Sequence, residues 1–292
     1  MRFGLVKTGF YTAVLADLPV AEVAEWAAGV GFDAVEVDVG RHLGGPDGIT
    51  AGVDAVRRHG IGVCALTYFG FLLDGDPATR ERTRAGVAAT VDAAAESGVD
   101  LVVTFAGRDQ GLSEDENYRE LASFLGPLAE RGGGHGVRIA IENWPGPRKD
   151  FVATTPEGWG RLFELLPAPN VGLNFDPSHL VWQGIDHEEA VDGVADRIFL
   201  AHAKDTEVIP ERLQQVGYFG SGWWRYRLPG QGEVDWARWM GRLQQRGFGG
   251  VISIEHEDRD WGFGTSGDPN LRKEGLLRGK RILETVIRGA PS

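Results

Sequence analysis

The stretch from Asn170 to Asp205 decides how the chain is interpreted. It begins Asn170-Val-Gly-Leu-Asn-Phe-Asp-Pro-Ser-His-Leu and ends Arg-Ile-Phe-Leu-Ala-His-Ala-Lys-Asp205. Each half is a short apolar run that stops abruptly on polar side chains able to ligate a metal. The first run stops on Asp176 and His179, and the second stops on His202. We interpret each half as a buried strand that carries its chemistry at its carboxyl end.

Two other apolar runs end in the same way, at Glu142 and at Glu255. Desolvating an unpaired carboxylate costs several kcal/mol unless a cation or a donor compensates it. Four strand ends that carry Glu142, Asp176, His202 and Glu255 therefore indicate one shared cation. Three carboxylates and one imidazole suit Mn²⁺, Mg²⁺ or Co²⁺ and tolerate Zn²⁺ or Fe²⁺, so we expect a divalent metal.

Short β-branched runs alternate with longer segments of helical period along the whole chain. This alternation is typical of βαβ units and a parallel sheet. Eight runs are predicted to be strands: Phe3 to Lys7, Ala34 to Asp38, Gly62 to Thr67, Leu101 to Phe105, Arg138 to Glu142, Val171 to Asp176, Ile198 to His202 and Val251 to Glu255.

These eight units predict an α/β fold of the (β/α)8 TIM barrel type. An open, doubly wound sheet is the alternative, but no Gly-rich phosphate fingerprint follows the first strand. In a barrel the carboxyl ends of all strands meet at one face, which would bring the four polar ends together. No linker divides the chain, so we expect residues 1–292 to form a single domain. A long loop at about 204–233, rich in Trp and Arg, is expected to be an ordered lid or binding wall.

Composition excludes several classes of function. The chain has 292 residues and a formal net charge of -12, with no Lys/Arg cluster, so nucleic acid is not an expected partner. Its single cysteine, Cys64, lies in an apolar run and is interpreted as a core residue, and no disulfide can form within the chain. No apolar run approaches a membrane span of about 20 residues, and the N-terminus lacks a signal-peptide pattern. We expect a cytoplasmic protein that does not bind membranes.

Several residues near the strand ends are candidates for binding a substrate. His179 would contact a substrate oxygen or serve as an acid, although a solvated or helix-capping histidine is the alternative. Lys204 would either pair with Asp205 or offset substrate charge. The remaining candidates line the expected barrel mouth or the long loop: Glu36, Tyr68, Trp144, Arg225 and Arg227. Aromatic side chains there could pack against a sugar ring or could be ordinary barrel lining.

The order of these motifs resembles the sugar phosphate isomerase/epimerase family, whose fold is the xylose isomerase-like TIM barrel. The resemblance rests on five stretches that occur in the family's order: Ile-Glu142-Asn, Asn-Phe-Asp176-Pro-Ser-His179, His202-Ala-Lys-Asp205, Arg227-Leu-Pro-Gly-Gln-Gly-Glu-Val-Asp-Trp236 and Ile-Ser-Ile-Glu255-His-Glu-Asp258. It implies that Glu142, Asp176, His202 and Glu255 hold a divalent metal, often Mn²⁺. It also implies that the two glutamates double as acid and base, and that His179 contacts the substrate.

The resulting prediction is a metal-dependent isomerase or epimerase of a sugar or keto-sugar. It would act by proton abstraction next to a carbonyl, through an enediolate that the metal stabilises. One alternative is a lyase or glycoside-cleaving enzyme of the C-glycoside deglycosidase type, acting on a 3-keto sugar. Another is a non-catalytic carbohydrate-binding barrel. The sequence leaves open whether the chain forms a homo-oligomer or needs a partner subunit, and whether its substrate is phosphorylated.

Overall fold

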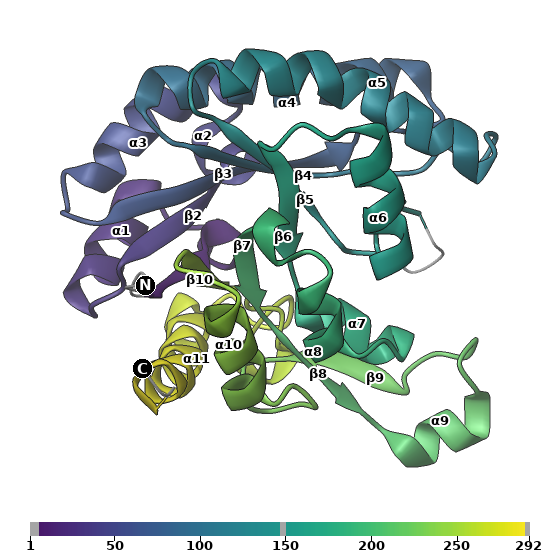
Figure 1. The fold of residues 1–292 in the computed structure, drawn as a ribbon. Helices are drawn as coiled ribbons and strands as arrows, with labels where there is room; N and C mark the ends of the chain where they lie inside the picture. The colour runs from purple at the N-terminus through teal and green to yellow at the C-terminus, as the bar shows by residue number, and fades with distance from the viewer. Residues whose placement is uncertain (1–5, 147–149, 290–292) are drawn as a thin grey trace.

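A closed barrel of eight parallel strands, covered by helices, forms the body of the molecule (Figure 1). The computed structural model describes residues 6–146 and 150–289. Around the barrel the strands follow the order β1-β10-β7-β6-β5-β4-β3-β2. Their bounds are β1 Lys7–Tyr11, β2 Ala34–Asp38, β3 Gly62–Phe71, β4 Leu101–Phe105, β5 Arg138–Glu142, β6 Val171–Phe175, β7 Ile198–Ala203 and β10 Val251–Ile254. The predicted TIM barrel is confirmed.

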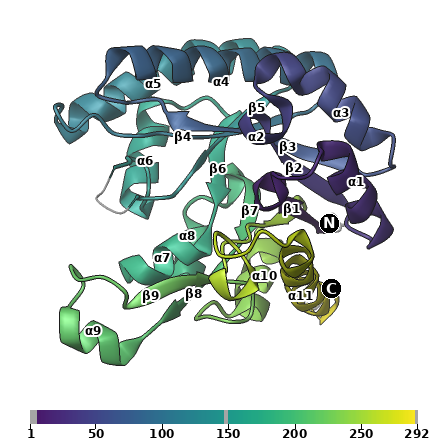
Figure 2. The ribbon, with the colours of Figure 1, turned by 180° about the vertical axis from the view of Figure 1, so that it is seen from behind.

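Helices connect successive strands and cover the outside of the barrel (Figure 2). Several begin at side chains that accept from a backbone N–H, as Asp76 does at α4 and Ser113 at α5. The helices are α1 Val20–Gly29, α2 Val39–Leu43, α3 Ile49–Arg57, α4 Pro77–Ser97, α5 Glu114–Gly133, α6 Pro156–Leu165, α7 Pro177–Gln183, α8 His187–Asp192, α9 Pro210–Val216, α10 Trp236–Gln245 and α11 Pro269–Gly289. Within the described part of the chain, no helix is long and apolar enough to cross a membrane.

The first strand lies later in the chain than predicted. The prediction was Phe3 to Lys7, of which residues 3–5 lie outside the described part, whereas β1 is Lys7–Tyr11. Its neighbours explain the difference, because a Cβ on Gly9 would lie 2.9 Å from the carbonyl oxygen of Ala34 in β2. Glycine therefore permits close approach of the two strands here, although glycine in a sequence usually indicates a turn.

The segment predicted as a long loop at about 204–233 has regular structure. Strands β8 Asp205–Val208 and β9 Trp224–Arg227 pair antiparallel, and α9 lies in the connection between them. This arm extends away from the barrel on the side of α7 (Figure 1). The prediction of an irregular loop was therefore wrong. Along β9, Trp and Tyr alternate with Arg, a pattern that is typical of an exposed antiparallel strand.

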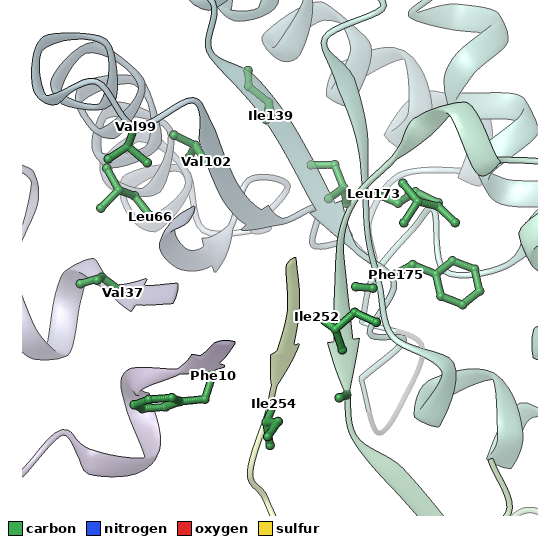
Figure 3. Packing of buried hydrophobic residues seen from close by; sticks show 14 of the residues in the cluster. Phe10, Val37, Leu66, Val99, Val102, Ile139, Leu173, Phe175, Ile252 and Ile254 are labelled. Atoms are coloured by element: carbon green, nitrogen blue, oxygen red, sulfur yellow. The ribbon is translucent and has the colours of Figure 1, made fainter. Parts of the chain in front are cut away.

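Two sets of apolar side chains stabilise the barrel. The larger set lies between strands and helices and includes Val102, Ile139 and Leu173 (Figure 3). A smaller set contains Leu101 and Val103, which flank Val102 in β4, together with Ala65, Ala140 and Leu200. Because side chains alternate between the two faces of a strand, this smaller set fills the barrel interior.

Candidate metal centre and active site

The four predicted ligand residues come together at the carboxyl ends of four adjacent strands. Glu142 ends β5, Asp176 follows β6, His202 lies in β7 and Glu255 follows β10. One ligand atom from each lies within 4.8 Å of all the others, and all four side chains are buried. The strand order places β5, β6, β7 and β10 side by side, so parallel pairing alone brings their ends to one point.

Within the described residues, two atoms of this cluster make no hydrogen bond, although charged groups lie near them. They are Nδ1 of His202 and Oδ2 of Asp176, both buried. Nδ1 of His202 lies 3.2 Å from Oε2 of Glu255 and 3.8 Å from Oε2 of Glu142. The other oxygen of Asp176 accepts from the backbone N–H of Ser178 at 2.8 Å, which fixes the carboxylate. Buried atoms of this kind, in a set of three carboxylates and one imidazole, fit a divalent cation.

Glu36 lies below the cluster, inside the barrel, rather than in the substrate cavity as expected. Its Oε1 accepts from the Thr67 hydroxyl at 2.5 Å. Its Oε2 accepts from the Ser253 hydroxyl at 2.7 Å and lies 2.9 Å from Nε2 of His202. A carboxylate on Nε2 keeps the proton on that nitrogen and leaves Nδ1 free to ligate.

His179 lies in the first turn of α7 and is buried, whereas a loop position above the barrel was expected. Its Nε2 lies 3.3 Å from both Oε1 of Glu142 and Oδ2 of Asp176. Its Nδ1 lies 2.9 Å from the hydroxyl of Tyr226, which β9 supplies from the arm. An ionised carboxylate can accept a hydrogen bond but cannot donate one. The Nε2 that faces Glu142 and Asp176 therefore carries the proton, and Tyr226 donates to Nδ1.

Lys204 points into the site and does not pair with Asp205. Its ammonium group contacts Glu255, lies 3.0 Å from Oε2 of Glu257 and lies 3.2 Å from Oδ2 of Asp176. It also lies 4.4 Å from the centre of the Tyr226 ring. Lys204 thus offsets part of the negative charge that the carboxylates concentrate here.

Asp205 instead holds the arm against the barrel. Its carboxylate accepts from the backbone N–H of Gly230 and Val234, each at 3.0 Å, and from the indole N–H of Trp236 at 3.0 Å. A Cβ on Gly232 would lie 2.4 Å from Oδ1 of Asp205, so only glycine permits this approach. The Gly-rich stretch before α10 therefore serves packing around Asp205.

Burial and charge shift the two glutamates in opposite directions. Burial raises the pKa of Glu142, and the nearby charge of Glu255 raises it further. Burial would also raise the pKa of Glu255, but Lys204 and His202 outweigh it and hold that pKa well below its usual value. Burial lowers the pKa of His179, and the charge of Lys204 lowers it further. Such divergent pKa values are typical of catalytic sites.

A cavity of about 280 Å³ opens above the cluster and reaches both glutamates. Of the predicted substrate-binding residues, Trp144 and Lys204 line it. Tyr68 does not, because its ring packs outward against Gly86 of α4. Arg225 and Arg227 instead pair with acidic groups of the arm and its surroundings, including a contact of 2.6 Å from each to Oε2 of Glu207.

Other lining residues were not among the predicted site residues: Tyr11, Arg41, Phe69, Tyr226, Glu257 and Phe263. The sequence held a signal for Phe69. Strand β3 extends to Phe71, so inward positions alternate through Thr67 and reach Phe69, while Tyr68 faces outward. Nothing comparable indicates Tyr226, because its place depends on how the arm folds back.

The comparisons with known proteins agree with this geometry. A sequence profile of the xylose isomerase-like TIM barrel matches residues 24–282. The chain belongs to this family. This assignment agrees with the closed barrel of the structure.

Curated relatives include proteins of different activity. The chain is 25% identical over 300 residues to the uncharacterized protein YfiH of Bacillus subtilis (strain 168), covering 87% of this chain and 93% of YfiH. It is 27% identical over 150 residues to the inosose isomerase of Bacillus velezensis, covering 50% of this chain and 49% of that protein. It is 27% identical over 243 residues to the 3-dehydroshikimate dehydratase of Pseudomonas putida, covering 80% of this chain and 35% of that protein.

Solved structures show the same fold over nearly the whole chain. The IolI protein with a bound zinc atom superposes with a TM-score of 0.76 at 22% identity, covering 98% of this chain and 100% of IolI. A D-tagatose 3-epimerase-like protein superposes with a TM-score of 0.73 at 20% identity, covering 97% of both chains. At these identities the likeness extends to the fold.

Proposed function

We propose that this protein is a divalent-metal-dependent isomerase or epimerase of a sugar or keto-sugar that transfers a proton at the carbon next to a carbonyl. One observation carries the proposal: Glu142 and Glu255 belong to the buried four-residue cluster and also line the cavity above it. The same two carboxylates can therefore hold a cation and reach a bound substrate. The relatives named inosose isomerase and the D-tagatose 3-epimerase-like fold support this class of chemistry.

Glu142, Asp176, His202 and Glu255 would hold the metal, for which we propose Mn²⁺, while the zinc in IolI supports a divalent ion more generally. When bound, the metal polarises the substrate carbonyl and so makes the neighbouring C–H more acidic. A carboxylate is a weak base for a carbon acid, because its reference pKa is near 4. Both glutamates must therefore lie beside the metal, where the C–H of the substrate is more acidic, for the reaction to proceed.

Different side chains of the site would carry out different parts of the proton transfer. One of Glu142 and Glu255 takes the proton from carbon, and the other returns one. The Nε2–H of His179 points toward Glu142 and Asp176, and we propose that it donates to a substrate oxygen near the metal. Lys204 adds positive charge at the same place. Return to the same carbon gives epimerisation, and return to the neighbouring carbon gives isomerisation.

A lyase is the second candidate, because the relatives include dehydratases as well as isomerases. The same proton removal leads to elimination when a β-substituent carries away the electron pair of its bond to carbon. On a 3-keto glycoside this would release the aglycone. A non-catalytic carbohydrate-binding barrel is less consistent with two glutamates at one cation site.

Deuterium exchange tests the proposal directly. The metal-loaded protein is incubated in D₂O with free ketoses, inososes and 3-keto glucosides, and C–H signals are followed by NMR. Exchange of one C–H position supports proton transfer if EDTA treatment abolishes the exchange and Mn²⁺ restores it. If metal binds at one ion per chain and no compound exchanges, the proposal is overturned, and binding or a missing partner subunit becomes the better explanation. Release of an aglycone, without incorporation of deuterium into the starting compound, would favour the lyase.

A further inference from the structure

A second cavity lies next to the one above the cluster and is lined in part by Trp224, Arg225 and Tyr226 of the arm. The second cavity has a volume of about 390 Å³ and shares Tyr226, Glu257 and Phe263 with the first. A free monosaccharide bound at the four ligands would fill only the first cavity. The second cavity therefore has room for a further part of a larger substrate.

Aromatic side chains form a continuous surface from one cavity into the other. Tyr226 and Trp224 are two residues apart in β9, so both lie on the same face of that strand. Their ring centres are 4.9 Å apart, with 61° between the planes. Trp182 of α7 stacks on Trp224 with ring centres 4.7 Å apart and planes 2° from parallel. This stacking holds the Trp224 ring in place at the wall of the second cavity.

Three charged side chains line the second cavity: Arg225, Arg259 and Glu257. Glu257 lies 3.0 Å from the ammonium group of Lys204. Arg225 already pairs with Glu207 at 2.6 Å and with Asp260 at 3.2 Å. In residues 6–146 and 150–289, no acidic side chain forms an ion pair with Arg259, although the whole chain carries a net charge of -12. Arg259 is therefore available to a negatively charged group of a ligand.

We propose that the second cavity is a subsite for an acidic aromatic substituent on the keto-sugar, held by stacking on Trp224 and by an ion pair with Arg259. This inference rests on the proposed function, because it assumes that the keto-sugar itself binds at the four ligands. It narrows the substrate class to a keto-glycoside with an aryl group that bears a carboxylate. Stacking and one partly exposed ion pair together should strengthen binding by about tenfold.

Three 3-keto-β-glucosides test this, with methyl, phenyl and 4-carboxyphenyl substituents. We expect KM to fall in that order and to be about tenfold lower for the 4-carboxyphenyl compound than for the methyl compound. Trp224→Ala should remove most of the advantage of both aryl compounds over the methyl compound. Arg259→Ala should remove only the difference between the 4-carboxyphenyl and phenyl compounds. Arg238→Ala, on the exposed face of α10, is the control and should change none of the ratios.

A binding measurement separates this inference from the proposed function. The unoxidised 4-carboxyphenyl β-glucoside has no ketone in its sugar ring and undergoes no proton transfer. Its binding is followed by tryptophan fluorescence with the metal-loaded protein and each variant. Binding weakened by both Trp224→Ala and Arg259→Ala supports the subsite even if no 3-keto glucoside reacts, in which case only the proposed function fails. Equal KM for all three 3-keto glucosides, or binding that neither variant weakens, would overturn the subsite.

Discussion

The two halves of the barrel mouth differ in chemistry although the strands that build them are alike. Strands β5, β6, β7 and β10 end in Glu142, Asp176, His202 and Glu255, which form the cation site. Strands β1, β3 and β4 instead supply Tyr11, Phe69 and Phe105 to the cavity. Phe69 and Phe105 stack with ring centres 3.8 Å apart. One half supplies the residues that could hold a cation, and the other half supplies aromatic rings beside them.

One residue connects the halves. Glu36 belongs to β2, in the aromatic half, yet its carboxylate contacts His202 across the barrel interior at 2.9 Å. In this way the aromatic half orients a ligand of the other half without exposing a charge to the cavity. The contrast between the halves leads to four predictions, because each change should affect one function and spare the other.

The largest effect is expected from Glu255→Gln. The amide keeps the size of the side chain but removes its negative charge and its basicity, so turnover should fall by about 10²–10⁴-fold. The measurement is the initial rate of metal-dependent C–H exchange in D₂O. Glu142→Gln should have an effect of the same order.

The control for this substitution is Glu211→Gln in α9, where the side chain is exposed and lies outside the cavity. Its exchange rate should equal that of the unaltered protein. A Glu255→Gln protein that exchanged at a near-normal rate would remove Glu255 from the chemistry.

Phe105→Ala should affect the aromatic half and spare the cation site. Phe105 is buried against Phe69, Trp144 and Phe151. Truncating a buried phenylalanine costs about 3–5 kcal/mol, and we expect the lower end because one side of this ring borders a cavity. Urea unfolding measures the loss, and the affinity for Mn²⁺ should stay within about twofold of normal.

Phe219→Ala is the matched control, because Phe219 at the tip of the arm is fully exposed. Its free energy of unfolding should change by less than about 0.5 kcal/mol. An equal loss in both variants would show that Phe105 is not part of a packed wall.

The half of the barrel mouth that contains the four ligand-type residues was predicted well from the sequence, for a physical reason. A charged residue at the end of a short apolar run is costly unless something compensates it, so Glu142 and Glu255 stood out. Parallel pairing then places strand ends at one face whatever the details of the loops. The barrel and the grouping of its four ligand-type residues could therefore be predicted from local pattern alone.

The aromatic half was harder to predict, because aromatic residues are ordinary in barrel cores. The end of β3 was placed at Thr67, and with it Tyr68 was assigned to the cavity in place of Phe69. The partner of Glu36 lies 166 residues further along the chain, and no local pattern indicates so distant a contact. The same is true of Tyr226, whose position depends on the arm that Asp205 anchors.

Glu36→Gln tests the connection between the halves. An amide in place of the carboxylate no longer fixes the proton on Nε2 of His202, so the affinity for Mn²⁺ should fall by about 10–100-fold. Competition with a chromophoric chelator measures the affinity, and urea unfolding of the metal-free protein shows whether the barrel stays folded.

Ser253→Ala is the matched control for Glu36→Gln, because it removes one donor to the same carboxylate and leaves the contact with His202. Its affinity should fall by less than about fivefold, as expected for one neutral hydrogen bond. A folded Glu36→Gln protein with normal affinity would contradict the role assigned to Glu36.

The smallest effect is expected from Tyr226→Phe, which removes one hydroxyl and leaves the ring beside Lys204. The hydroxyl donates to Nδ1 of His179 and so keeps the proton on Nε2, which faces the carboxylates. Losing one hydrogen bond of about 1 kcal/mol should raise KM about fivefold and leave the affinity for Mn²⁺ unchanged. The ¹⁵N shifts of His179 report its tautomer directly and should show a mixture of both forms in the variant. A raised KM with an unaltered tautomer would mean that Tyr226 acts on the substrate itself, while Tyr218→Phe, at an exposed tyrosine of the same arm, should change neither quantity.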